Sequence, residues 1–279
     1  MHFHKIVIVL TVMLLMSLAV AAAQDDDQTF TSHTSGSDMP FVLLSLYTSE
    51  GCSSCPPADA LLTQIQADAI RNDIPIYPLA FHVDYWDYLG WEDPYSSSVY
   101  SQRQRAYGRA WNSRRIYTPQ MIVNGAVGFV GSNAQVAQKQ INEALKINPQ
   151  YQIAVTAESH EDSPLTVRIQ YDIKPLQDDL KEDVVLNIAL AQNDLVTRVR
   201  GGENRGRTLS HNAVVRNFIT LSVNKDDLTG QATLILPSTE LEATRCIPAN
   251  TNIVVFVQNP ESMEVLGASQ LPYPVALKK

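Results

Sequence analysis

The sequence has few cysteines, no excess of positive charge and, after its first residues, no long apolar run. Its 279 residues include three cysteines, which are too few for a disulfide framework in an exported protein, and odd in number. The net charge of −8, without a cluster of basic residues, argues against nucleic-acid binding. No later run is long and apolar enough to cross a bilayer. We therefore expect a soluble protein with no nucleic-acid partner.

The chain begins with a pattern typical of a secretory signal peptide. Lys5 supplies a short positive region, residues 6–20 form an apolar stretch, and an Ala-Ala-Ala cleavage site follows. The apolar run approaches the roughly 17 residues that span a bilayer, so an uncleaved anchor is the alternative. We expect residues 1–23 to be removed, which leaves a periplasmic or secreted protein with no membrane contact. Residues 24–39, acidic and rich in Ser and Thr, are expected to form a disordered leader.

Residues 40–149 alternate between strand and helix patterns. A buried-strand pattern at 41–49 precedes an amphipathic helix pattern at 57–70, and a second buried-strand pattern follows at 74–86. This order predicts a parallel strand–helix–strand unit. The later stretch "QMIVNGAVGFVG" predicts two strands joined by a tight Asn-Gly turn, and an amphipathic helix comes after it.

Residues 150–279 have a different pattern. About seven short runs of alternating or β-branched apolar residues are separated by loops rich in Asp, Asn, Gly and Pro. No convincing helix interrupts them. This pattern is typical of an immunoglobulin-like β-sandwich. We therefore predict an α/β domain at 40–149 followed by an all-β, immunoglobulin-like sandwich domain at 150–279.

Cys52 and Cys55 lie where the first predicted strand meets the first predicted helix. The positive end of a helix favours a thiolate, and a second thiol one turn later can release a mixed disulfide. Cys52 is therefore the expected nucleophile and Cys55 the expected resolving thiol. A purely structural disulfide and a metal site remain as alternatives. Zinc needs four ligands, which one cysteine pair does not supply, whereas copper(I) could use the two thiolates with His82.

A Thr-Pro pair, Thr118 and Pro119, lies directly before the later strand and strengthens the redox interpretation. Together with the Cys-Ser-Ser-Cys it resembles the thioredoxin-like fold, in which a cis X-Pro bond faces the cysteines and presents a backbone edge to a substrate peptide. The stretches "TSEGCSSCPPAD", "FHVDYWDYLGW", "SQRQRAY" and "YTPQMIVNG" resemble a family of secreted bacterial proteins catalogued as a domain of unknown function with a thioredoxin-like core. The resemblance implies a thioredoxin-like fold for residues 40–149 and the position of an active site, but no known reaction.

Two positions depart from the thioredoxin pattern. Leu46 stands where many thioredoxins have a buried carboxylate, and Gly51 stands where they often have Trp. Another group must then serve as the base. The candidates are Glu50, next to the cysteines, and His82 and Asp84, which share one face of a predicted strand.

Tyr85 and Trp86 begin a stretch dense in aromatic and acidic residues, 85–95. Such a stretch forms either a peptide- or sugar-binding rim or a local core that anchors a loop. We assign Tyr85 and Trp86, with Thr118 and Pro119, to substrate binding.

Three other features lead to weaker interpretations. The arginines of a helix pattern at 96–111 are expected on a solvated face. A glycine-bearing segment with three arginines and a histidine, 200–211, could lean over the cysteine pair, although the sequence does not show that it does. Cys246 is interpreted as a small buried residue next to a strand.

These patterns predict an exported thiol–disulfide oxidoreductase that uses no cofactor and acts on protein substrates bearing thiols or disulfides. Two alternatives belong to other classes. One is a non-catalytic extracytoplasmic binding module with a structural disulfide, and the other is a copper-handling protein.

Overall fold

The computed structural model describes residues 39–160, 162–177, 183–223, 227–237 and 246–274. The predicted signal peptide and all but the last residue of the predicted leader lie outside these residues. Within the described ranges, no helix combines the length and apolar character needed to cross a membrane.

The first part of the described chain alternates between strands and helices. In chain order its elements are β1 (Val42–Thr48), α1 (Pro56–Asn72), β2 (Ile76–His82), the 3-10 helix η1 (Asp84–Leu89), α2 (Ser98–Ala110), β3 (Gln120–Val123), β4 (Val127–Val130) and α3 (Ala134–Ala144). β1 and β2 are parallel, which confirms the predicted strand–helix–strand unit. β3 and β4 form the predicted antiparallel hairpin, and Asn124 and Gly125 in its turn both have positive φ.

The second part of the described chain consists mainly of strands. They are β5 (Tyr151–His160), β6 (Ser163–Pro175), β7 (Val185–Gln192), β8 (Leu195–Arg198), β9 (Thr208–His211), β10 (Val214–Ser222), β11 (Thr229–Ile235), β12 (Thr251–Gln258) and β13 (Val265–Pro272), with a 3-10 turn η3 (Pro248–Asn250) before β12. β11, β6 and β5 form a three-stranded sheet, and β8 and β9 form a separate hairpin.

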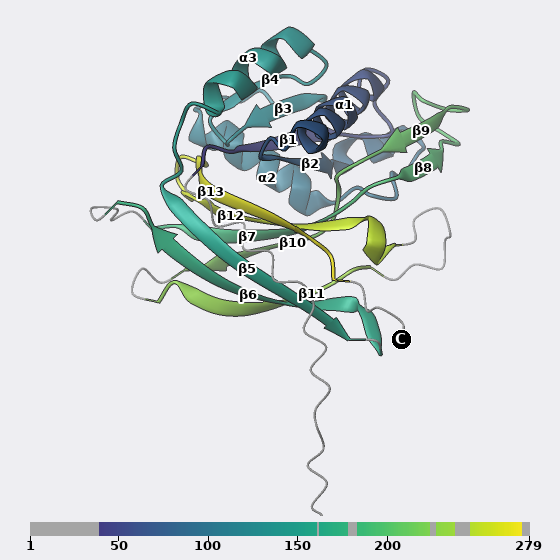
Figure 1. Ribbon diagram of the computed structural model, residues 1–279. Helices are drawn as coiled ribbons and strands as arrows, with labels where there is room; N and C mark the ends of the chain where they lie inside the picture. Colours follow the sequence, from purple (N-terminus) through teal and green to yellow (C-terminus); the bar gives the residue numbers. More distant parts are fainter. Residues whose placement is uncertain (1–38, 161, 178–182, 224–226, 238–245, 275–279) are drawn as a thin grey trace, which may run out of the picture.

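Strands from both parts belong to one mixed eight-stranded sheet, in the order β13-β12-β7-β10-β2-β1-β3-β4 (Figure 1). The parts join where β10 runs parallel to β2, with Val214 opposite Ala80. The Ala80 N–H also donates to the Ala213 carbonyl at 2.7 Å. The predicted fold class, an α/β thioredoxin-like domain followed by an all-β immunoglobulin-like sandwich domain, is therefore wrong. Local periodicity predicts strands, but it does not show which distant strand pairs with β2.

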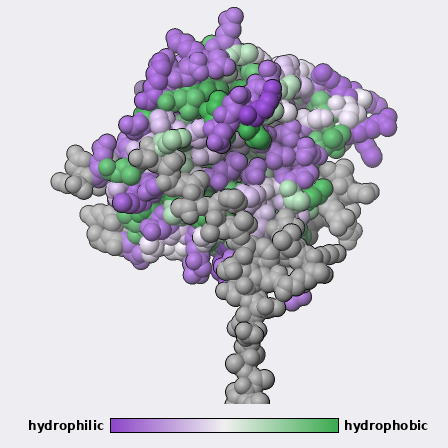
Figure 2. All heavy atoms as spheres, viewed as in Figure 1, coloured by the Kyte–Doolittle hydropathy of each residue, from purple (hydrophilic) through white to green (hydrophobic). Residues whose placement is uncertain are grey.

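Helices cover both faces of the sheet at the β1 end. Leu44 and Leu46 of β1 belong to a hydrophobic cluster with α1 and α3, whereas Leu43 and Tyr47 belong to a cluster with α2 on the opposite face. This alternation follows from the two-residue period of a strand, and it explains why β1 is apolar on both faces. On the visible surface, hydrophilic residues predominate and hydrophobic ones form small separate areas (Figure 2).

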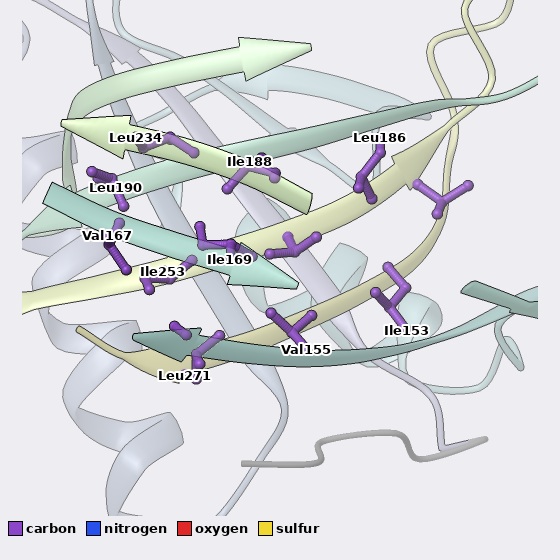
Figure 3. Close-up of a cluster of buried hydrophobic side chains, with 14 of the residues drawn as sticks. Ile153, Val155, Val167, Ile169, Leu186, Ile188, Leu190, Leu234, Ile253 and Leu271 are labelled. Carbon is purple, nitrogen blue, oxygen red and sulfur yellow. The ribbon is translucent and has the colours of Figure 1, made fainter. Parts of the chain in front are cut away.

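The three-stranded sheet covers the other end of the large sheet. Side chains of β5, β6 and β11 pack against those of β7, β12 and β13 in one hydrophobic cluster, which includes Ile153, Ile169 and Ile188 (Figure 3). Cys246 is a free cysteine buried in the same cluster, as expected for a small buried residue.

Candidate functional site

Cys52 and Cys55 form a disulfide between the end of β1 and the start of α1. Their Cα atoms lie 5.5 Å apart, and both residues are fully buried. The Sγ of Cys52 lies 3.3 Å from the hydroxyl of Ser54. Pro56 begins the helix directly after Cys55. Backbone N–H groups in the first helical turn have no intrahelical acceptor, so proline costs no helix hydrogen bond at this position. The two cysteines predicted as the redox pair are therefore joined by a disulfide at the start of a helix.

Thr118 and Pro119 lie close to the first turn of α1. The peptide bond between them is cis, as the resemblance implied. β3 starts directly after Pro119 and pairs with β1, the strand that leads to the cysteines. A Cβ built on Gly131 would lie 3.2 Å from the Cβ atoms of both Pro119 and Ala58, and Ala58 belongs to the first turn of α1. Pro119 is thus at the same end of the sheet as the disulfide.

Trp86 contacts both Thr118 and the cysteine turn. Its indole Nε1 donates to the Thr118 hydroxyl at 2.7 Å, and its Cβ would lie 3.0 Å from a Cβ built on Gly51. A larger residue just before the first cysteine would therefore displace Trp86. Tyr85 lies instead against α2, where its hydroxyl donates to Gln104 Oε1 at 3.1 Å. The Thr118 side chain also acts on the Tyr85 hydroxyl, where it opposes the rise in the pKa of Tyr85 that burial causes. Trp86 therefore joins Thr118 to the cysteine turn.

Glu50 and Asp84, two of the predicted acid–base residues, lie in different parts of the structure. Glu50 is fully buried next to the disulfide. Its Oε1 lies 3.1 Å from His211 Nε2, and its Oε2 accepts a hydrogen bond from Trp91 Nε1 at 2.8 Å. Asp84 lies at the start of η1, where its carboxylate accepts a hydrogen bond from the hydroxyl of Ser101 on α2. Glu50 therefore belongs to the cysteine turn, whereas Asp84 belongs to the contact between η1 and α2.

His82, the third candidate, forms a buried ion pair with Asp93. Its Nδ1 lies 2.7 Å from Asp93 Oδ2, and the same oxygen accepts the Glu50 N–H at 2.8 Å. Burial acts to lower the pKa of His82, but the Asp93 carboxylate outweighs burial and raises that pKa to about 8. Burial acts to raise the pKa of Asp93, and the charge of His82 outweighs it and lowers that pKa. The pair is thus charged near neutral pH and holds the turn through Glu50.

Sequence reasoning missed two buried carboxylates near the site. Asp93 lies in the acidic aromatic stretch, where nothing in the sequence distinguishes it from its neighbours. Asp59 lies on α1 four residues after Cys55, and this spacing could have singled it out because it places both side chains on one helix face.

The loop between β8 and β9, residues 199–207, covers the cysteine turn, and we call it the cap loop. Asn204 at its centre is fully buried. The side-chain amide of Asn204 donates to the carbonyls of Glu50 at 2.8 Å and Cys52 at 2.9 Å. The segment that the sequence left undecided therefore does lie over the cysteines.

Two further contacts hold the cap loop in place. The carboxylate of Glu203 accepts the Ser53 N–H at 2.8 Å. A Cβ built on Gly201 would lie 2.1 Å from the Gly90 carbonyl oxygen, so this close approach to the aromatic stretch requires glycine. The cap loop and the aromatic stretch together cover the disulfide.

No group of three or more His, Cys, Asp or Glu side chains is arranged to hold a metal ion in the described part of the chain. Cys52, Cys55 and His82, the ligands of the copper alternative, do not form such a group. The two sulfurs are bonded to each other, and His82 Nδ1 faces Asp93.

A protein-family model described as "Protein of unknown function (DUF1223)" matches residues 43–258. The chain belongs to this family. This membership confirms the predicted resemblance to an uncharacterised family and adds no reaction. No curated protein matches the DUF1223 chain.

Two solved structures resemble this DUF1223 protein. A crystal structure of an Agrobacterium tumefaciens protein, determined by a structural-genomics consortium, has a TM-score of 0.61 and 23% identity, and the match covers 86% of this chain and 98% of that one. The structure named "HBP35 of Porphyromonas gingivalis" has a TM-score of 0.60 and 15% identity, with 88% and 80% covered. At these identities the likeness shows a shared fold only.

Proposed function

We propose that this DUF1223 protein is an exported thiol–disulfide oxidoreductase that exchanges its Cys52–Cys55 disulfide with protein thiols. The observation that carries the proposal is the disulfide at the start of α1, with Pro119 and Trp86 next to the same turn. The positive end of the helix favours the thiolate that exchange requires. The likeness of the Cys-Ser-Ser-Cys and Thr-Pro motifs to those of thioredoxin-like proteins supports the same chemistry.

The exchange has two steps. A substrate thiolate attacks Cys52 Sγ, and the bond to Cys55 breaks with its electron pair on the Cys55 sulfur, which takes up a proton. A second substrate thiolate then attacks the substrate sulfur of the mixed disulfide and releases Cys52 as a thiolate. The substrate dithiol is oxidised, and the disulfide of this protein is reduced. The reverse sequence reduces a substrate disulfide.

Substrate access requires movement of the cap loop, because both sulfurs are fully buried beneath it. Once the loop lifts, a substrate chain meets a surface formed by Thr118, Pro119 and Trp86. A hydrogen bond from Trp86 to Thr118 holds this surface together. The partners are therefore extended segments of proteins that carry a thiol or a disulfide.

An extracytoplasmic location fits this chemistry. Disulfides form and persist in oxidising compartments such as the periplasm or the exterior of the cell. The N-terminal sequence pattern typical of a signal peptide supports the same location. We propose that the protein is periplasmic or secreted.

One observation favours a second candidate function. Both cysteines are fully buried, and the buried Asn204 binds the turn through two carbonyls. These contacts suit a permanent disulfide in a non-catalytic extracytoplasmic binding module, in which the aromatic stretch would contact the partner.

Trapping of a mixed disulfide tests the proposal. In a Cys246→Ser background, Cys55→Ser leaves Cys52 as the attacking thiol and removes the resolving one. We expect this variant to form a stable mixed disulfide with a peptide that contains a disulfide bond. Mass spectrometry detects the adduct at Cys52. The matched Cys52→Ser variant, which retains Cys55, should react far more slowly. Equal reactivity of the two variants, or no adduct in either, would contradict the assigned roles.

A further inference from the structure

Five ionisable side chains are buried near the disulfide turn: Glu50, Asp59, His82, Asp93 and His211. Four of them lie in two close pairs, His82 with Asp93 and His211 with Glu50, whereas Asp59 makes no salt bridge with any described residue. We propose that Asp59 accepts the proton of the buried Cys55 thiol when the disulfide forms, and returns it when the disulfide opens. This inference rests on the proposed redox function.

The buried position of the disulfide creates the need for such a group. Both sulfurs are shielded from solvent, so a proton released by Cys55 has no direct path to bulk water. Burial in a medium of low dielectric also disfavours a thiolate, the form in which sulfur attacks. A nearby base that takes the proton as the sulfur attacks removes this obstacle.

Asp59 has the right position on α1. Its backbone N–H donates to the Cys55 carbonyl at 3.2 Å, so the two residues are one helical turn apart. Residues at this spacing lie on the same helix face. Side chains in a helix lean toward its N-terminus, so the Asp59 carboxylate leans toward the turn that contains Cys55.

The surroundings of Asp59 suit a proton acceptor. Burial raises its pKa, against the opposing effects of His211, then of His82, and of the Thr48 side chain. The nearby charge of Asp93 adds to the rise. A carboxyl group with a raised pKa gains and loses protons closer to neutral pH than a free one, which is the condition for efficient proton transfer.

Asp59 also has an outlet to solvent. A cleft of about 390 Å³ between α1 and β9 is lined by Asp59 and His211, with Pro56, Thr63 and Arg207 around them. Asp59 is 6% exposed there. The Nδ1 atom of His211, a residue that lines this cleft, is buried without a hydrogen-bond partner among the described residues.

The step is balanced in protons and electrons. The proton of the Cys55 thiol moves to the Asp59 carboxylate as the Cys55 sulfur attacks Cys52 Sγ in the mixed disulfide. The bond between Cys52 and the substrate sulfur breaks, and the substrate leaves with the electron pair as a thiolate. Asp59 then releases its proton to water in the cleft, and the substrate thiolate takes a proton from solvent. The protein dithiol is oxidised, and the substrate disulfide is reduced.

Asp59→Asn tests the assignment, because it removes the base and nearly preserves the side-chain volume. Reduced protein is mixed with Ellman's reagent across a pH series, and the second release of thionitrobenzoate reports the attack of Cys55 on Cys52. We expect this phase to slow on the order of a hundredfold at neutral pH in Asp59→Asn. Its pH dependence should also lose the inflection that Asp59 causes. Asp59→Glu should restore part of the rate, which a purely structural role would not predict.

A matched control is Asp68→Asn, an aspartate on the exposed side of α1 that pairs with Arg71. It should leave both phases unchanged. If Asp59→Asn is folded and its second phase equals that of wild type at every pH, the role of Asp59 is overturned while the redox function stands. If wild-type protein gives no first release, the proposed function itself fails.

A second measurement covers the case in which Asp59→Asn does not fold. The carbon NMR signal of the Asp59 carboxyl in wild-type protein is titrated in the oxidised and in the reduced state. Because the thiol and the carboxyl exchange one proton, the titration of Asp59 should differ between the two states. Identical titrations would overturn the proposal.

Discussion

The two ends of the eight-stranded sheet are stabilised by different interactions. Around β7 and β12 a continuous hydrophobic cluster joins the two sheets (Figure 3). Around the disulfide, the His82–Asp93 ion pair, the contact of Glu50 with His211, and side-chain hydrogen bonds to the backbone, such as that of Asn204 to Cys52, join distant segments. Burial of apolar surface contributes stability directly, whereas burial of charge costs free energy unless each charge is paired. The apolar end therefore secures the fold, whereas the polar end holds the groups to which we assign the proposed exchange.

The largest expected effect is at the apolar end. Ile188→Ala removes a fully buried side chain from the hydrophobic cluster, and we expect it to lower the free energy of unfolding by about 2–5 kcal/mol. Denaturant unfolding measures this change. Ile235→Ala, at a position 56% exposed on β11, is the control and should change stability by less than about 0.5 kcal/mol. Equal losses in the two variants would remove the contrast between core and surface on which the comparison rests.

A smaller effect is expected from pH at the polar end. The pKa of His82 is raised to about 8 in the folded protein, from about 6.5 when unfolded. The contribution of His82 to the free energy of unfolding is therefore fully present below pH 6.5 and is lost as pH rises through 8. At 1.36 kcal/mol per pKa unit, the loss is about 2 kcal/mol. Unfolding free energies measured across this range should fall in wild type. In His82→Gln this fall should vanish, and a fall of the same size there would assign it to another group.

The smallest expected effect concerns the cap loop. Asn204→Ala removes two hydrogen bonds that hold the loop on the turn, each worth about 0.5–1.5 kcal/mol. We expect reduction of the disulfide by a small dithiol to accelerate roughly tenfold, because the free energy that favours the closed loop falls by about 1.4 kcal/mol. Asn142→Ala on the exposed face of α3 is the control. A rate equal to wild type in Asn204→Ala would mean that the loop does not limit access to the sulfurs.

Much of the local structure could be predicted from the sequence. The buried run before Cys52 and the helical pattern after Cys55 indicate β1 and α1, and the Asn-Gly turn indicates the β3–β4 hairpin. These predictions succeed because apolar periodicity and turn chemistry act over a few residues.

The arrangement of the strands could not be predicted in the same way. A parallel bridge between Val214 and Ala80 joins the two parts of the sheet, and no local pattern encodes it. Arg103 shows the same limit. The sequence predicts a solvated face for it, but its guanidinium lies 4.8 Å from the ring centroid of Phe218 on β10. That prediction was wrong because strands from the second part of the chain cover this face of α2.

The candidate site was predictable in part. The cysteine pair and Thr118-Pro119 are recognisable from sequence motifs, whereas Asn204 reaches Cys52 across 152 residues. Glu50 and His211 are likewise brought together across 161 residues. Such contacts depend on where the β8–β9 hairpin docks, which residue spacing alone does not give.

The reduction potential of the Cys52–Cys55 pair in the wild-type protein tests the central claim most directly. Equilibration with glutathione or dithiothreitol buffers, followed by thiol alkylation and mass spectrometry, measures it. A working exchange pair should have a potential of about −120 to −270 mV. A value below roughly −300 mV is typical of a structural disulfide that stays closed, and it would contradict the proposed function.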